Sequence, residues 1–249
     1  MQKSIKKLHN EFKRIKEMGW IEEKRTYKGA AGYTFETLLE KEEDNFPVPD
    51  YDDIEIKTIN KNAKTNVHLF NLIPDGDYLF PIKRILYTLG LPYKGNEEER
   101  YFYRSFNAAK DTFLAFGRKG RLELDYRYEK LNLKIYNNRH EDIDIGVSWS
   151  FDYIKERLEL KLKYLAVIKV KSCIISGVGY YHYDTITFYK LKDFKTFIRL
   201  IDDGIIEVTF KIGVHKDGPK KGKIYDHGTD FSINISDIDE LYDVMDITD

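Results

Sequence analysis

Residues 53–60 read DIEIKTIN, in which isoleucine alternates with charged or polar residues. Side chains of an extended strand point alternately to the two faces of a sheet, whereas a helix repeats every 3.6 residues. The alternation therefore predicts a strand that buries Ile54 and Ile56 on one face and presents Glu55 and Lys57 on the other. A sheet with one buried face is thus expected to be part of the fold.

Helical periodicity precedes this strand. Residues 5–18 repeat apolar side chains at helical spacing, and Gly19 follows as a stop, which predicts an amphipathic helix. A second helix is expected over 33–43, ended by the Phe-Pro-Val-Pro stretch at 46–49. The apolar run from Val67 to Ile73 is expected to pair beside the 53–60 strand.

The rest of the chain alternates between strand and helix signals. The expected elements are a helix at 78–89, strands at 101–137 around a turn at 117–120, a helix at 151–162, two strands within 163–191, a helix at 193–203, and a two-stranded hairpin at 205–234 joined by a Gly/Pro/Lys loop at 216–222. These elements predict a mixed α/β fold.

Composition excludes several classes of protein. The chain has 249 residues, 42% of them hydrophobic, and a net charge of -1, which fits a folded protein but neither indicates nor excludes a nucleic-acid partner. Its one cysteine, Cys173, excludes an internal disulfide framework and a Cys-rich zinc site. Because no apolar run reaches the length of about 20 residues that spans a membrane, we expect a cytoplasmic protein without a membrane partner.

Carboxylates and a lysine converge at the predicted 53–60 strand. Asp50 lies at the corner that enters the strand, and Glu55 and Lys57 share its polar face. Asp50 and Glu55 can hold Mg²⁺, with the carbonyl of Ile56 as a further oxygen ligand. A metal so held, with Lys57 beside it, suits phosphodiester hydrolysis. The alternative is a half-exposed strand whose charged side chains simply face water.

The predicted hairpin at 205–234 concentrates positive charge. It is a candidate for contact with a nucleic-acid groove or backbone, although surface loops are also rich in lysine for solubility. The candidate residues are Lys211, His215, Lys216, Lys220, Lys221, Lys223 and His227.

Two stretches together resemble a known family. KGAAGYTFETLLE at 28–40 followed by PDYDDIEIKTIN at 49–60 is similar to the MvaI/BcnI family of restriction endonucleases, which is itself similar to the mismatch-repair nicking enzyme MutH. FKIGVHKDGPKKGKIYDHGTDFSI, at 210–233, resembles the family's C-terminal recognition segment. The resemblance spans 28–234, with no recognisable motif between 90 and 160.

The resemblance implies a PD-(D/E)XK nuclease core with a β-rich DNA-recognition lobe. The catalytic lobe would comprise residues 1–90, completed by segments from about 150–190, and residues 91–249 would mainly form the recognition lobe. The implied activity is Mg²⁺-dependent cleavage of double-stranded DNA at a short, nearly palindromic site, by a monomer that nicks each strand in turn. A DNA methyltransferase would be the functional partner that protects host DNA.

Residue by residue, the resemblance gives Asp50, Glu55 and Lys57 the roles of the PD-(D/E)XK triad. It makes Glu36 the helix carboxylate beside the triad and places Lys28 among the DNA-contacting residues. Lys211 and Ser232 stand where family members often carry arginine for guanine. The resemblance implies targets of the CC-W-GG and CC-S-GG type. Because arginine makes the commonest bidentate contact to guanine, the absence of both arginines leaves the target bases of this chain open.

Two other functions remain open at this point. A MutH-like repair enzyme would use the same chemistry but nick only one strand and depend on a partner ATPase. A DNA-binding module would keep the carboxylates as structural groups and cleave nothing.

Overall fold

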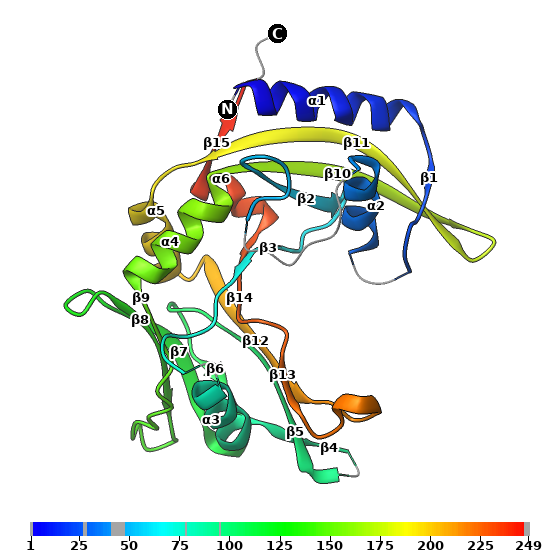
Figure 1. Ribbon diagram of the computed structural model, residues 1–249. Coiled ribbons are helices and arrows are strands. Elements are labelled where there is room, and N and C mark those ends of the chain that lie inside the picture. The colour runs from blue at the N-terminus through cyan, green and yellow to red at the C-terminus, as the bar shows by residue number, and fades with distance from the viewer. Residues whose placement is uncertain (1, 27–28, 41–47, 78, 95, 247–249) are drawn as a thin grey trace. The chain divides into compact units, whose positions relative to one another are not determined.

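The computed structural model describes residues 2–26, 29–40, 48–77, 79–94 and 96–246 (Figure 1). The chain forms two compact units, each built from segments that are separated in the sequence. Unit 1 consists of Met1–Val67, Arg157–Asp193 and Ile238–Asp249, and unit 2 consists of His68–Glu156 and Phe194–Asp237. In this division residues 68–90 fall in unit 2 and Ile238–Asp249 in unit 1, whereas the expected catalytic lobe comprised residues 1–90 with about 150–190. The assignment of catalytic and recognition lobes stays a prediction.

Unit 1 contains a mixed sheet with strand order β1-β11-β10-β2, and β15 pairs with β11. Its elements are α1 (Gln2–Glu17), β1 (Ile21–Glu22), α2 (Ala30–Leu38), β2 (Ile54–Asn60), β10 (Tyr164–Ile175), β11 (Val178–Leu191), α6 (Ile238–Leu241) and β15 (Tyr242–Met245). Strands β10 and β11 form a long antiparallel hairpin. Strand β2 runs parallel to β10, with Glu55 opposite Leu165 and Lys57 opposite Val167.

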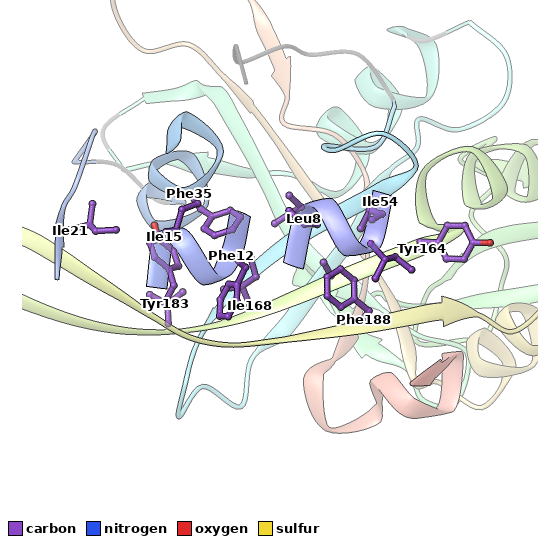
Figure 2. Packing of buried hydrophobic residues seen from close by; sticks show 14 residues of the cluster. Leu8, Phe12, Ile15, Ile21, Phe35, Ile54, Tyr164, Ile168, Tyr183 and Phe188 are labelled. Carbon is purple, nitrogen blue, oxygen red and sulfur yellow. The ribbon is translucent and has the colours of Figure 1, made fainter. Parts of the chain in front are cut away.

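Helix α1 covers one face of this sheet, as its amphipathic sequence predicts. Its apolar residues Leu8, Phe12 and Ile15 are buried against Ile168 of β10 and Phe188 of β11 (Figure 2). Complete burial of a side chain of this size contributes about 1.5–3 kcal/mol, so this one helix face supplies much of the core of unit 1. Ile54 and Ile56 belong to the same cluster, which fixes the face that β2 turns inward.

Unit 2 contains two sheets. The first has the order β3-β14-β12-β5-β4 with β13 beside β12, and the second has the order β6-β7-β8-β9. Its elements are α3 (Leu79–Leu89), β4 (Leu91–Tyr93), β5 (Asn96–Phe106), β6 (Thr112–Phe113), η1 (Ala115–Gly117), β7 (Lys119–Asp125), β8 (Lys130–Tyr136), β9 (Ser148–Ser150), α5 (Phe194–Asp202), β12 (Ile206–Val214), η2 (Gly218–Lys220), β13 (Ile224–Asp226), β14 (Asp230–Asn234) and η3 (Ile235–Asp237). Strand β3 (Asn66–Asn71) and helix α4 (Phe151–Leu162) cross the division between the units.

Aromatic side chains fill the core of unit 2. Trp149 is completely buried, and its indole N–H donates a hydrogen bond of 3.0 Å to the carbonyl of Leu72. The Phe231 ring packs edge-on against the Trp149 ring and stacks on the Phe70 ring. Alternation along β12 turns Val208, Phe210 and other apolar residues toward this core.

Most expected elements are confirmed, but the bounds of the second helix and the pairing of the 67–73 run are wrong. The second helix begins at Ala30 and ends at Leu38, earlier at both ends than 33–43, and residues 41–43 lie outside the described residues. The run at 67–73 forms β3, which pairs with β14 rather than with β2. One edge of β2 pairs with β10, and on its other edge the side chain of Asp50 accepts a hydrogen bond from the Ile56 N–H.

The segment 205–234 also differs from the expected hairpin, because its return strand is divided into β13 and β14. Gly228, between the two, has a φ of 89°, which side-chain-bearing residues rarely adopt. A Cβ at this position would lie 2.6 Å from Cγ of Asn71. The backbone break therefore depends on glycine.

Among the helices of the described residues, none combines the length and the apolar character needed to cross a membrane.

Candidate active site

A tight turn leads into β2 and places Asp50 beside it. Tyr51 and Ile54 exchange two backbone hydrogen bonds of 2.9 and 2.8 Å, and Asp52 within the turn has a φ of 51°. Asp50 then folds back along the strand, where its Oδ2 accepts a hydrogen bond of 2.9 Å from the Ile56 N–H. The N–H and C=O of one strand residue point to the same side, so the Ile56 carbonyl also faces this edge of β2.

Glu55 is the buried centre of the site. Glu55 is 0% exposed, and its side chain lies on the strand face opposite Ile54 and Ile56. Lys57 lies two positions along on the same face, and its Nζ forms an ion pair with Glu55 Oε1. The predicted placement of Glu55 and Lys57 on one face is thereby observed.

A second lysine, which the sequence reasoning missed, contacts the same carboxylate. Lys161, near the end of α4, has its Nζ 3.3 Å from Glu55 Oε1. Helix α4 leads directly into β10, the strand parallel to β2. The signal that could have found Lys161 is therefore topological, since a helix that precedes a neighbouring parallel strand ends beside that strand.

Tyr242 of β15 also borders Glu55. The pKa of Tyr242 is raised, first by burial and second by the negative charge of Glu55. Its hydroxyl is buried and has no hydrogen-bond partner within the described part of the chain. The site thus includes a residue from the last strand of unit 1, far in sequence from the predicted motif.

The pKa of Glu55 is raised. Burial is the largest cause, and the negative charge of Asp50 raises the pKa further. The positive charges of Lys57 and Lys161 act in the opposite direction. Two cations thus partly offset the cost of keeping this carboxylate ionised in the interior.

The oxygen atoms at this edge fit a hard divalent cation. Glu55 Oε2 is buried and, in the described residues, has no hydrogen-bond partner, while Oε1 is held by the two lysines. Asp50 is close enough to influence Glu55, and the Ile56 carbonyl faces the same edge. Carboxylate and carbonyl oxygens are the ligands that Mg²⁺ prefers. No group of three or more His, Cys, Asp or Glu residues able to hold a metal occurs in the ranges that the structure describes.

Glu36 lies on α2, which packs against β2. It projects from α2 toward Gly32 and Thr58: a Cβ placed on Gly32 would lie 3.6 Å from Glu36 Oε1 and 3.3 Å from Thr58 Oγ1. Thr58 alternates with Lys57, so its side chain points to the strand face opposite Glu55. Glu36 also raises the pKa of Tyr183, a residue of the core beneath α1. The structure therefore places Glu36 by the helix-covered face.

The predicted DNA-contacting residues of the hairpin all lie in unit 2. Lys216, Lys220, Lys221 and Lys223 are exposed on the loop that contains η2. His215 and His227 pack their rings against the Tyr225 ring, with centroid distances of 5.0 and 4.6 Å. Lys216 Nζ lies 3.9 Å from the Tyr93 ring centroid.

Three other predicted residues differ from this pattern. Lys211 is half-buried on β12, and its Nζ lies 2.6 Å from Asp230 Oδ2. Ser232 is only 5% exposed on β14, so it is not part of the exposed lysine-rich loop. Lys28 lies outside the described residues.

Comparison with known proteins connects this geometry to a family. The model of the MvaI/BcnI restriction endonuclease family matches residues 9–242. The chain belongs to the MvaI/BcnI family of restriction endonucleases. No curated protein matches it.

Two solved structures extend the MvaI/BcnI likeness to the fold. The complex of restriction endonuclease MvaI with its cognate DNA substrate is 32% identical in sequence and has a TM-score of 0.89, with 100% of each chain covered. MvaI in the absence of DNA is also 32% identical, with a TM-score of 0.64 over 100% of this chain and 99% of that one. The mixed α/β fold of this chain is thus that of an MvaI/BcnI restriction endonuclease along its whole length.

Proposed function

We propose that this protein is a type II restriction endonuclease that hydrolyses phosphodiester bonds of double-stranded DNA at a short, nearly palindromic site. The observation that carries the proposal is the buried Glu55 carboxylate, which contacts Lys57 and lies beside Asp50 at an open strand edge. This arrangement matches the spacing of a PD-(D/E)XK core. Support comes from family membership and from MvaI, a relative that was solved with its cognate DNA substrate.

Asp50, Glu55 and the carbonyl of Ile56 would hold Mg²⁺. The bound ion would polarise the scissile phosphate and lower the pKa of an attacking water. The protein supplies the donor set by burying Glu55 and leaving its Oε2 without a hydrogen bond from the described residues. Ion pairs with Lys57 and Lys161 hold Oε1, so the carboxylate is fixed in orientation before substrate arrives.

Lys57 has a second role in this proposal. Its side chain is 19% exposed, whereas that of Glu55 is 1% exposed, so the ammonium lies between the buried carboxylate and the outside. A lysine in this position donates hydrogen bonds to the water or to the phosphate oxygens and stabilises the negative charge that develops on them. Glu36 is the remaining candidate from the family pattern. Because it lies near Thr58, by the other face of β2, we propose that it acts on the metal and the phosphate less directly than Glu55.

Unit 2 would bind the duplex. One loop exposes four lysines, Lys216, Lys220, Lys221 and Lys223. Each contact of a lysine with a phosphate releases condensed counterions, which strengthens binding at low salt. His215 and His227 flank the same loop beside Tyr225. We propose that these residues contact DNA and that the target differs from CC-W-GG, because Lys211 and Ser232 replace arginine.

Two further features of the proposal concern the working form of the enzyme. We infer a monomer with a single active site, which has to cut the two strands in turn, so that nicked DNA accumulates transiently. A DNA methyltransferase is the inferred functional partner, since host DNA that carries the target requires protection.

The decisive experiment incubates the protein with unmethylated phage and plasmid DNA in Mg²⁺, with EDTA as a control, and sequences the ends produced. We expect discrete fragments that share a terminal sequence. Lys57→Ala should abolish cleavage while binding is retained. Lys169→Ala, which removes an exposed lysine from the neighbouring strand β10, is the matched control and should cut normally.

Other outcomes of this experiment overturn parts of the proposal. Nicking of one strand without linearisation would indicate a MutH-like enzyme. DNA that stays intact in every form, methylated or mismatched, while the protein still binds it, would indicate a non-catalytic DNA-binding module.

A further inference from the structure

Two enclosed oxygen atoms of unit 1 have no hydrogen bond from the described residues. They are Oε2 of Glu55 and the hydroxyl of Tyr242, and these residues are 0% and 1% exposed. Buried polar groups are almost always hydrogen-bonded, because an unpaired group loses the contacts with water that it makes in the unfolded chain. Two such oxygens in one unit therefore require an explanation.

The strand registers place both groups on the same face of the sheet. Glu55 lies opposite Leu165 of β10, and Leu165 lies opposite Tyr189 of β11. Directly opposite residues of paired strands share a face, so Tyr189 lies on the face of Glu55. The Tyr242 ring packs edge-on against the Tyr189 ring, with 6.1 Å between the ring centroids. Tyr242 therefore reaches the face that carries Glu55.

The connection into β15 holds Tyr242 in place. Lys192, the residue after β11, donates a backbone hydrogen bond of 3.1 Å to the Leu241 carbonyl. The Nζ of Lys192 donates to the carbonyls of Asp239 and Glu240, at 2.6 and 3.2 Å. These three hydrogen bonds tie α6 to the end of β11, so the backbone that carries Tyr242 is fixed relative to the sheet.

Tyr242 and Glu55 interact without a direct hydrogen bond. Burial first, and the negative charge of Glu55 second, raise the pKa of Tyr242. The phenol therefore keeps its proton and can donate, whereas an ionised carboxylate only accepts. A donor and an acceptor that are near each other, buried and otherwise unpaired are the two partners that one bridging water needs.

We propose that Tyr242 is a positioning residue whose hydroxyl holds Oε2 of Glu55 through one buried water molecule. The Tyr242 O–H donates to the water oxygen, and the water donates one of its hydrogens to Oε2. This oxygen keeps a second lone pair for Mg²⁺, while Lys57 and Lys161 hold Oε1. The carboxylate is thus oriented at both of its oxygens. The inference rests on the proposed function in taking Glu55 as a metal ligand.

A crystal structure of the unsubstituted protein tests the bridge directly. We expect one ordered water within about 3 Å of both Tyr242 Oη and Glu55 Oε2. Tyr242→Phe removes only the hydroxyl, so the same structure of this variant should lack the ordered water while the ring keeps its place.

Metal binding gives a second readout, which needs no DNA cleavage. Mn²⁺ takes the same kinds of oxygen ligand as Mg²⁺, and its binding is measured by electron paramagnetic resonance. Tyr242→Phe should bind Mn²⁺ about ten- to a hundredfold more weakly than the unsubstituted protein, the usual effect of losing a group that orients a metal ligand. The Mg²⁺ concentration that gives half-maximal cleavage should rise by a similar factor.

Tyr183→Phe is the matched control. Tyr183 is also a buried tyrosine of unit 1, but it belongs to the core beneath α1, and its hydroxyl donates a hydrogen bond of 2.8 Å to the Ala31 carbonyl. Both substitutions should lower the free energy of unfolding, because each leaves an acceptor without its donor. Only Tyr242→Phe should weaken Mn²⁺ binding.

Three results would overturn the inference. A Tyr242→Phe protein that gains stability and binds Mn²⁺ normally would show that the hydroxyl is unpaired in the folded protein. Equal weakening of Mn²⁺ binding in Tyr242→Phe and Tyr183→Phe would show a general structural effect. An unsubstituted crystal structure without a water between the two oxygens would exclude the bridge, and this result decides the question if Tyr242→Phe does not fold.

Failure of the inference and failure of the proposed function are distinguishable. Unsubstituted protein that cuts DNA but lacks the bridging water refutes the inference alone. Unsubstituted protein that holds the water and binds Mn²⁺ but cuts no DNA refutes the proposed function alone, and protein that binds no Mn²⁺ removes both.

Discussion

Lys161 Nζ lies 3.3 Å from Glu55 Oε1, the same carboxylate oxygen that Lys57 contacts. One lysine comes from the strand that carries Glu55 and the other from a helix about one hundred positions later in the sequence. Their positive charges lower the pKa of Glu55 against the larger effect of burial. Two residues thus share the task of keeping one buried carboxylate ionised.

Replacing Lys161 should make cleavage more sensitive to acid. In Lys161→Met the pKa of Glu55 rises further, because one of the two cations that lower it is gone. As the pH falls, the carboxylate is then protonated at a higher pH than in the unsubstituted protein. The acid limb of the pH–rate profile should therefore shift to higher pH. We expect cleavage about ten- to a hundredfold slower on that limb. Lys155→Met, which alters an exposed lysine of α4, should leave the profile unchanged; an identical shift in both variants would contradict the assignment.

Glu36 should matter less than Glu55 for cleavage. Glu36 lies near Thr58 and Tyr183 by the helix-covered face, whereas Glu55 lies on the other face with both lysines. We expect Glu36→Gln to slow single-turnover cleavage by less than about tenfold and Glu55→Gln to slow it by more than about a hundredfold. Equal losses would mean that Glu36 reaches the reacting phosphate when DNA is bound.

Asp226 should destabilise the protein at neutral pH. Burial raises the pKa of Asp226 to about 6, against a hydrogen bond from the Gly228 N–H that lowers it. Because the folded protein holds this proton more tightly than the unfolded chain, the favourable contribution is complete below about pH 4 and is lost as the pH rises through about 6. Asp226→Asn should therefore raise the free energy of unfolding by about 1–3 kcal/mol at pH 7.5 and by about half as much at pH 5.

Urea unfolding at the two pH values checks this expectation. Asp217→Asn, in an exposed loop of the same unit, is the control and should change the free energy of unfolding little at either pH. A stabilisation by Asp226→Asn that does not depend on pH would contradict the explanation.

Helix α1 should be essential for the stability of unit 1. Leu8 is completely buried between this helix and the sheet, so Leu8→Ala removes buried surface and leaves a cavity (Figure 2). We expect a loss of about 2–5 kcal/mol in the free energy of unfolding, measured with urea. Lys7→Ala on the exposed side of the helix should cost less than about 0.5 kcal/mol. A similar small loss for Leu8→Ala would show that α1 is not part of the cooperative core.

Local patterns predicted the local parts of the molecule well. The alternation at 54–57 correctly placed Glu55 and Lys57 on one face because strand geometry depends on neighbouring residues alone. The helical spacing of Leu8, Phe12 and Ile15 correctly identified the buried side of α1. The family likeness seen in the residues was confirmed by the match over 9–242.

The missed features depend on contacts between distant segments. The sequence near Val67 does not predict that β3 pairs with β14, because this pairing joins segments more than 150 positions apart. Lys161 and Tyr242 reach Glu55 only because β10 and β15 join the sheet of β2. The contact of Asp230 with His68 was likewise not predictable, because a single sequence does not specify which strands are neighbours.

The pairing of β15 with β11 has a consequence for how the protein is made. Unit 1 gathers its sheet from three stretches of chain, and the last of them, with Tyr242, follows all of unit 2. A ribosome therefore has to synthesise all of unit 2 before the surroundings of Glu55 can be complete. A nascent chain that still lacks Tyr242 therefore lacks part of the proposed catalytic centre, and translation itself would delay the moment at which a host genome is first exposed to cleavage.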